Sequence, residues 1–260
     1  MYTKIITEEY IRERLKNGLR DDSRSPFTYR NITIKTGNMP NAEGSAEVTL
    51  GNTTVIAGVK VDVGTPLKDK PEEGSIITSA ELSPMASDKY EPGPPTPEAI
   101  EISRVIDRGI RAANVVDTKS LYINEEKVWN AYIDIYAVNY DGNIFDAGTL
   151  AAIAALSTSK MPRFEDEKVV RENMGKLKIN AISTSCTFAK VAGHILLDPD
   201  GNEEAFSNVR LTIANDEKYI RAMQKGLGGS FTPKELDQMI DMTFNKSAEL
   251  RSSIKHAIGD

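Results

Sequence analysis

Cysteine, histidine and long apolar runs are scarce in this sequence. A single cysteine among 260 residues rules out an intrachain disulfide framework and fits a reducing compartment. No stretch approaches the ~20 consecutive apolar residues that a membrane-spanning helix needs, and the amino terminus has no signal-peptide core. We therefore expect a cytoplasmic protein that makes no contact with membranes.

Recognisable catalytic motifs are also missing. The sequence has no P-loop, no glycine pattern for dinucleotide binding, no zinc-ligand spacing and no nucleophile elbow. Its two histidines, His194 and His256, are too isolated to suggest a catalytic triad. Cys186 lies in a predicted strand, where a buried structural thiol is favoured over a nucleophile. These residues predict no catalytic, metal or cofactor site.

The charge balance limits the kinds of partner that the protein can attract. The chain has 32 basic and 38 acidic residues, a formal net charge of -6. No global field therefore draws it to nucleic acid. Any contact with RNA or DNA has to be local, or has to use a surface that a partner completes.

Three arginines share one face of a predicted helix. Arg104, Arg108 and Arg111 recur at i, i+4 and i+7, which places them within an arc of roughly 60°. The opposite side carries apolar residues that we expect to be buried, namely Ile102, Val105, Ile106 and Ile110. Stacked guanidinium groups suit a row of phosphates because each can donate two charge-assisted hydrogen bonds. On the stripe alone, a solvated face balanced by Glu101 and Asp107 is favoured.

A cluster of acidic residues has two possible meanings. Its members are Asp198, Asp200, Glu203 and Glu204. They could hold a divalent cation through oxygen ligands, or they could form an acidic solvated loop. We favour the solvated loop, because no second acidic cluster with comparable spacing supports a cation site.

Periodicity predicts strands first and a helix last in each half of the chain. In the first half we expect strands at 32–36, 46–50, 53–63, 75–82 and 129–138, and helices at 8–19, 97–116 and 147–156. Gly51-Asn52 should turn the second strand into the third as a hairpin, and Thr96 should cap the second helix, with Pro97 at its first position. In the second half we expect strands at 178–182, 186–191, 195–198 and 210–214, and a helix from a capping box at Thr232 to residue 257. The carboxylate of Asp146 lies in the cap region of the third helix, where it would repel phosphate.

The polar stretch 157–175 is the expected internal boundary of the chain. It would separate an N-terminal half, 27–165, from a C-terminal half, 176–260. Residues 1–26 would form a helix followed by a polar arm. Because that arm has little of its own to pack, it is a candidate for docking on a neighbouring protein.

Five segments, taken together and in order, match one known family. They are 29–37, 44–51, 55–60, 102–111, and Asp141-Gly142 with the small-residue helix that follows. Together they resemble the RNase PH family over about residues 24–257. The resemblance implies an α+β, RNase PH-like fold of two βαβα-type halves, similar to the second domain of ribosomal protein S5, with mixed sheets packed against central helices. It also implies assembly into six-membered rings.

Within this family the chain is most similar to the non-catalytic ring subunits of the archaeal exosome. Catalytic members carry a Gly-Gly-Thr-Arg type sequence whose arginine binds phosphate, and the corresponding stretch here, 142–146, has no arginine. They also carry two aspartates six residues apart, which correspond here to Glu204 and Arg210. A guanidinium stays protonated at neutral pH, so Arg210 cannot transfer a proton. The resemblance therefore implies a chain with no catalytic residue of its own.

The resemblance also implies partners and an RNA site. A catalytic RNase PH-like subunit would alternate with this chain in a heterohexameric ring, a trimer of heterodimers, and would hold inorganic phosphate as co-substrate. RNA-binding cap proteins would join the ring. Arginines of this subunit would reach the single-stranded RNA 3′ end in the partner's site. They correspond to Arg104 and Arg108, and Arg111 shares their face. With the resemblance, RNA binding becomes the favoured interpretation of the stripe.

Two alternatives stay open. The chain could be an active phosphorolytic exoribonuclease in its own right, although the lack of an arginine between Gly142 and Ala147 counts against it. It could instead be a structural ring subunit that does not touch RNA. The role of Lys68 and Lys70, in the loop 65–74, is also open, since they could line a central channel or face solvent.

Overall fold

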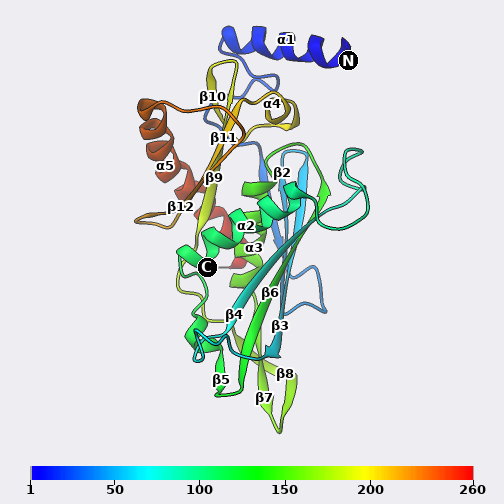
Figure 1. The fold of residues 1–260 in the computed structure, drawn as a ribbon, viewed down its shortest axis with the longest axis vertical. Helices are drawn as coiled ribbons and strands as arrows, with labels where there is room; N and C mark the ends of the chain where they lie inside the picture. The colour runs from blue at the N-terminus through cyan, green and yellow to red at the C-terminus, as the bar shows by residue number, and fades with distance from the viewer. Residues whose placement is uncertain (1, 260) are drawn as a thin grey trace.

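The computed structural model of the chain describes residues 2–259, with side chains from residue 7 onward. Two β-sheets lie on either side of a pair of helices (Figure 1). This arrangement confirms the predicted α+β fold with mixed sheets packed against central helices. No helix in the described part of the chain is both long and apolar enough to cross a membrane.

The first sheet has six strands and contains the predicted hairpin. They are β1 (Ile32–Thr36), β2 (Gly44–Leu50), β3 (Thr53–Gly64), β4 (Ser75–Leu82), β5 (Tyr122–Asn124) and β6 (Lys127–Asn139), in the order β1-β2-β3-β6-β4 with β5 paired to β6. A two-residue turn, Gly51-Asn52, joins β2 to β3, and Gly51 has φ 58°, a conformation that glycine adopts at low cost. Strand β4 runs parallel to β6, whereas the other pairs are antiparallel.

The two central helices are α2 (Pro97–Ala112) and α3 (Ile144–Ser157), and each contacts both sheets. As predicted, Thr96 caps α2, where its side chain accepts the Ala99 N–H at 3.2 Å. Helix α3 is buried almost all round. It lies so close to β2 that a Cβ on Gly44 would be 2.3 Å from the Ala155 carbonyl oxygen, so only glycine fits there.

The second sheet has four strands in the order β10-β9-β11-β12. They are β9 (Thr184–Val191), β10 (His194–Leu197), β11 (Val209–Asn215) and β12 (Ile220–Gly226). A short helix, α4 (Gly201–Ala205), precedes β11, and the long α5 (Pro233–Ile258) packs against β9 and β11. The capping box predicted at Thr232 is present, with Glu235 completing it.

Several segments differ from the prediction; β5 and α4, for example, were not predicted. The polar stretch at the expected boundary is mostly a hairpin of β7 (Lys160–Glu165) and β8 (Lys168–Lys176). The segment 178–182 is not a strand, because only an isolated bridge between Ile179 and Val116 pairs it. Strand β12 was not predicted. The boundary itself stays a prediction, and one core cluster runs through both halves, from Ala46 to Ile254.

The N-terminal arm packs against its own chain. Helix α1 (Tyr2–Lys16) is followed by Arg20, which is 1% exposed and pairs with Glu203. Arg24 forms an ion pair with Asp198 at 2.9 Å. The expectation that this arm has little to pack is therefore wrong for these residues, and its docking on a neighbour stays a prediction. The guanidinium groups of Arg20 and Arg24 form ion pairs with carboxylates that are distant in the sequence.

Candidate functional site

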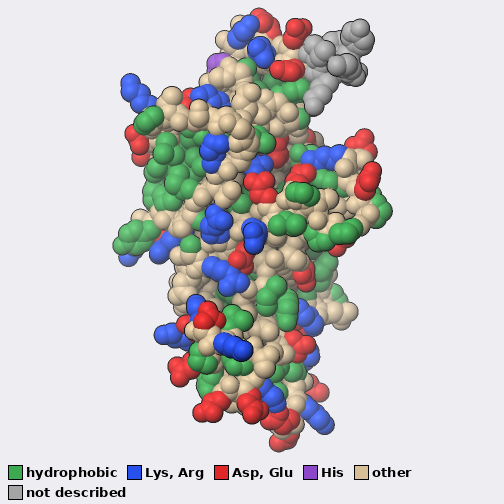
Figure 2. Space-filling view, viewed as in Figure 1, with side chains coloured by type: hydrophobic (Ala, Val, Ile, Leu, Met, Phe, Trp, Pro, Cys, Tyr) green, Lys and Arg blue, Asp and Glu red, His purple; other side chains and the backbone are tan. Residues whose placement is uncertain are grey.

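Helix α2 carries the arginine stripe on its exposed face. The four apolar residues opposite the stripe are buried, as predicted. Arg104 is exposed and makes no hydrogen bond or ion pair with the described residues. Arg108 is also exposed and donates to Oε1 of Gln224, on β12, at 2.8 Å. Figure 2 shows basic side chains gathered over the middle of this face, where α2 lies in Figure 1.

Arg111 differs from the other two arginines. Its Nε donates to the Asp107 carboxylate at 2.7 Å, and its Nη2 donates to the Ile76 carbonyl of β4. The side chain is therefore held against the first sheet by two protein acceptors. Arg111 shares the helix face by periodicity, but its guanidinium has fewer free donors for a ligand.

The acidic neighbours do not neutralise Arg104 and Arg108. Glu101 forms an ion pair with Arg210 at 2.6 Å, and Asp107 accepts hydrogen bonds from Thr78 and Arg111. The expected balance by these two carboxylates is thus present for Arg111, which Asp107 pairs, and absent for Arg104 and Arg108. Two guanidinium groups on α2 stay available for an anionic ligand.

A carboxylate occupies the amino-terminal end of α3. Asn143 caps this helix with φ 55°, and its side chain accepts the Asp146 N–H. The backbone N–H of Asn143 donates to Glu204 Oε2 at 2.8 Å. Burial raises the pKa of the Glu204 carboxyl above its ordinary value. A helix amino terminus favours anions, and here the chain itself supplies the anion.

Arg210 lies beside this carboxylate. Its guanidinium is 3.7 Å from Glu204, 2.6 Å from Glu101 and 4.1 Å from the centre of the Phe145 ring. The residue is only 7% exposed. A buried guanidinium that is paired twice stays protonated, so it can stabilise negative charge but cannot act as an acid or a base.

Asp146 was placed by the sequence in the helix cap, and the structure corrects its role. Asn143 is the cap, and the Asp146 carboxylate is fully buried against β9, where it accepts hydrogen bonds from Tyr29, Ser185 and Thr187. Burial raises its pKa to about 6. This carboxylate joins α3 to the second sheet and is not open to a ligand.

The acidic cluster is not a solvated loop, so that prediction was wrong. Asp198 and Glu203 are buried and are paired with arginines from before the first strand. Asp200 begins α4 by capping it, and burial raises its pKa to about 6. No group of three or more His, Cys, Asp or Glu side chains within the described residues could hold a metal ion.

Among the remaining candidate residues, Lys70 lines a cavity together with Arg111 of α2. Cys186 is buried and its thiol pKa is raised by burial to about 12, which suits a structural thiol and not a nucleophile. His194 and His256 are exposed on different elements. Lys70 pairs with Glu73 at 3.4 Å, and Lys68 is exposed. Gln224, which holds Arg108, was missed because its strand was not predicted.

Comparisons with known proteins place this chain in one protein family. Residues 28–162 match the family model described as 3′ exoribonuclease family, domain 1, and residues 181–246 match domain 2 of the same family. The chain is 44% identical to the exosome complex component Rrp42 of Thermococcus gammatolerans, covering 98% of this chain and 96% of that protein. It is 43% identical to Rrp42 of Methanothermobacter thermautotrophicus, covering 94% and 93%.

Solved structures extend the similarity to the whole fold. A chain of the Archaeoglobus fulgidus exosome with RNA bound to the active site superposes with a TM-score of 0.93 at 39% identity, covering 98% of this chain and 100% of that chain. A chain of an archaeal exosome core gives a TM-score of 0.87 at 36% identity, with the same coverage.

Proposed function

The chain belongs to the 3′ exoribonuclease family, also called the RNase PH family, and on that premise we propose that it is the non-catalytic subunit of an archaeal-type exosome. Nearly its whole length aligns with exosome components named Rrp42, and its fold matches chains of two archaeal exosome structures. The complex would degrade RNA from the 3′ end by phosphorolysis, in the cytoplasm.

The main support for a non-catalytic role is the position of Glu204 at the amino terminus of α3. Phosphorolysis needs a bound phosphate and a group that can transfer a proton. At the amino terminus of α3, the Asn143 N–H donates to Glu204 and is not free for phosphate. Beside it stands Arg210, which cannot exchange a proton at neutral pH. The phosphate requirement is therefore not met at this place, and the side chain at position 210 cannot transfer the proton.

The exposed arginines support a second part of the role. Arg104 and Arg108 present guanidinium groups that no carboxylate of the described residues neutralises. A local basic surface on an acidic chain suits RNA that is held between this chain and a partner. In this proposal Arg104 and Arg108 bind backbone phosphates near the RNA 3′ end, and Arg111 contributes less because its side chain is already engaged.

The partner would supply the chemistry. A catalytic RNase PH-like subunit would alternate with this chain in a hexameric ring, bind inorganic phosphate and attack the terminal phosphodiester, releasing nucleoside diphosphates. This chain would need no cofactor of its own. RNA-binding cap proteins would deliver single-stranded RNA to the ring.

The proposal is tested by phosphorolysis of a 3′-labelled single-stranded RNA by this chain alone, by the catalytic partner alone and by the reconstituted ring. Activity should appear in the ring and be absent from this chain. Trimming of RNA by the purified chain in phosphate buffer would show that it is an active exoribonuclease, and would overturn the proposal. A partner with full activity and full RNA affinity on its own would overturn it as well.

A further inference from the structure

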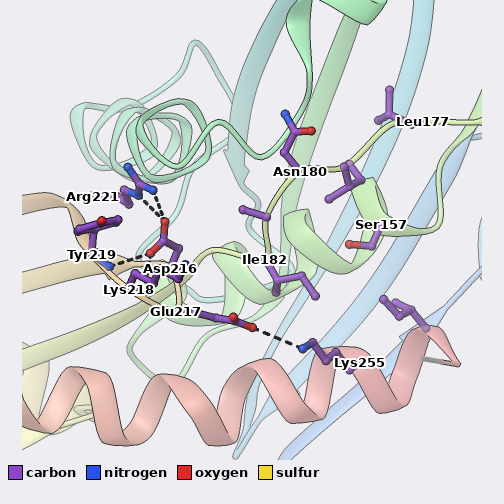
Figure 3. A pocket seen from close by; sticks show the side chains of 13 residues that line it. Ser157, Leu177, Asn180, Ile182, Asp216, Glu217, Lys218, Tyr219, Arg221 and Lys255 are labelled. Atoms are coloured by element: carbon purple, nitrogen blue, oxygen red, sulfur yellow. Dashed lines mark hydrogen bonds and ion pairs between the residues drawn. The ribbon is translucent and has the colours of Figure 1, made fainter.

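A pocket of about 510 Å³ opens at the carboxyl-terminal end of α5. Figure 3 shows Leu177, Asn180 and Ser157 on one side of it and Tyr219 with Arg221 on the other. One wall is the irregular segment 177–182, and the other is the turn between β11 and β12. The volume falls within the range of about 300–1,000 Å³ that is usual for ligand sites.

The first wall presents unpaired backbone groups. On one edge, the Lys178 carbonyl accepts the Asp117 N–H at 3.3 Å, and the Asn180 N–H donates to Val115 at 2.8 Å. On the other edge, the N–H and C=O groups of Ile179 and Ala181 make no hydrogen bond within the described residues, and both residues line the pocket. Backbone N–H and C=O groups left free along one side of a segment can pair with the backbone of another chain.

The second wall presents one uncompensated charge. Asp216 accepts the backbone N–H groups of Lys218 and Tyr219 at 2.8 Å each, and it forms an ion pair with Arg221. Glu217 is paired with Lys255 at 3.5 Å. Among the described residues this leaves the exposed Lys218 ammonium without a partner, so the rim favours a single carboxylate.

Apolar surface and one orphaned polar atom complete the pocket. Tyr219 is 60% exposed, and Ile182 and Ile258 also line the cavity. Ser157 Oγ is buried beside it and has no hydrogen-bond partner among the described residues. A tyrosine ring with so much exposed surface is well suited to be buried against another protein. A phosphate backbone suits the site less well, because Asp216 and Glu217 stand on the same turn.

We propose that this pocket seats an extended segment of another protein subunit. The segment's backbone pairs with the free edge at Ile179 and Ala181, an apolar side chain packs against Tyr219, and an aspartate or glutamate reaches Lys218. The inference rests on the proposed function for one point only, that the chain works within a multi-subunit assembly.

A photo-crosslinking experiment tests the kind of occupant. Tyr219 is replaced by the photo-reactive p-benzoylphenylalanine, and the reconstituted exosome is irradiated with and without single-stranded RNA. We expect a crosslink to one peptide of another subunit, with an acidic residue near the attachment point, in both conditions. A crosslink to RNA, or no crosslink to any subunit, would overturn the inference.

Charge reversal tests the contact with Lys218. We expect Lys218→Glu to weaken binding of the crosslinked subunit about 3- to 10-fold, and reversal of the acidic residue in that subunit to restore it. Lys234→Glu is the matched control, because Lys234 is exposed at the opposite end of α5 and should leave the affinity unchanged. Unchanged affinity in Lys218→Glu would overturn the inference. If the wild-type chain fails to assemble at all, the proposed function itself fails.

Discussion

The carboxylate of Glu204 accepts the backbone N–H of Asn143 at 2.8 Å, at the amino-terminal end of α3. The two residues are 61 positions apart in the sequence, and they meet because α4 brings Glu204 over the start of the helix. A helix terminus of this kind attracts phosphate when it is open. In this protein an internal carboxylate fills it, and Arg210 balances the charge.

This arrangement separates two roles that a catalytic subunit would combine. The end of α3 is closed by a carboxylate of the chain, whereas α2 keeps exposed guanidinium groups on its outer face. A surface that can bind phosphates but cannot transfer protons holds a nucleic acid without cleaving it. The proposed division of labour between this chain and a catalytic partner follows from that contrast.

The arginines of α2 should contribute unequally to RNA binding. In the reconstituted exosome, replacing both Arg104 and Arg108 by alanine should weaken RNA binding and slow degradation. For single strands, the slope of log K against log salt should become shallower by about 0.7 for each phosphate that the variant no longer binds. Arg111→Ala should have a smaller effect, because that guanidinium is held by Asp107 and Ile76. Fluorescence anisotropy at several salt concentrations measures both quantities.

Arg163 provides the matched control for this series. It is an exposed arginine on β7, paired with Glu165 at 2.7 Å, and its replacement by alanine should leave RNA affinity unchanged. Assembly should be intact in every variant, as judged by size-exclusion chromatography. If the double variant binds RNA as well as the wild type does, the chain is a structural ring subunit without RNA contact.

Breaking the buried ion pair of the N-terminal arm should destabilise the fold strongly. Arg20 donates to both carboxylate oxygens of Glu203, at 2.8 and 2.5 Å, and to two backbone carbonyls, and it is 1% exposed. Arg20→Ala leaves Glu203 buried without its partner, which should cost about 3–5 kcal/mol of unfolding free energy. Urea denaturation followed by circular dichroism measures the loss.

A surface pair on α1 is the control for that experiment. Arg12 and Glu8 form an ion pair at 3.1 Å, and both side chains are about half exposed. Such pairs contribute about 0–1 kcal/mol, so Arg12→Ala should change the unfolding free energy little. Equal losses in the two variants would show that burial of the Arg20 pair has no special importance.

Local patterns made much of the fold predictable. The hairpin at Gly51-Asn52, the cap at Thr96 and the capping box at Thr232 each depend on a few neighbouring residues, and all three were found. The buried apolar face of α2 was predictable from the helical spacing of its apolar residues. Strand β12 was missed because charged residues interrupt its alternation, as at Arg221.

Long-range pairing was not predictable from spacing. Arg20 and Glu203 are 183 residues apart, and nothing near either one indicates that they meet. For that reason the acidic cluster was expected to be solvated and the arm was expected to have little to pack against. Glu101 does not neutralise Arg104 or Arg108 because it forms an ion pair with Arg210 instead. Helical periodicity could not predict that long-range ion pair.

The close approach of β2 to α3 should make one glycine irreplaceable. A methyl group on Gly44 would lie 2.3 Å from the Ala155 carbonyl oxygen, which is backbone and cannot move aside. We expect Gly44→Ala to cost about 1–3 kcal/mol. Gly175→Ala is the control on β8, because its nearest atom would be 3.9 Å away. Thermal unfolding should show a lower Tm only for Gly44→Ala, and equal Tm values would contradict the packing described.

Asp146 should make the stability of the protein depend on pH. Its carboxyl is buried, and its pKa is raised from 3.8 to about 6. The folded state therefore binds a proton more tightly than the unfolded state does. Stability from this group is fully present below about pH 4 and is lost as the pH rises to about 6, by about 3 kcal/mol in total.

The variant Asp146→Asn isolates this contribution. The asparagine cannot titrate, and it accepts fewer of the hydrogen bonds that Tyr29, Ser185 and Thr187 donate, so the variant has a loss of stability that does not depend on its own titration. The informative quantity is the unfolding free energy of the wild type minus that of the variant, measured by urea denaturation from pH 4 to 8. Asp200, whose pKa is also about 6, titrates in both proteins and cancels. The difference should fall between pH 4 and 6 and stay level above; a difference that rises with pH would mean that the carboxylate is stabilised, not penalised, by its burial.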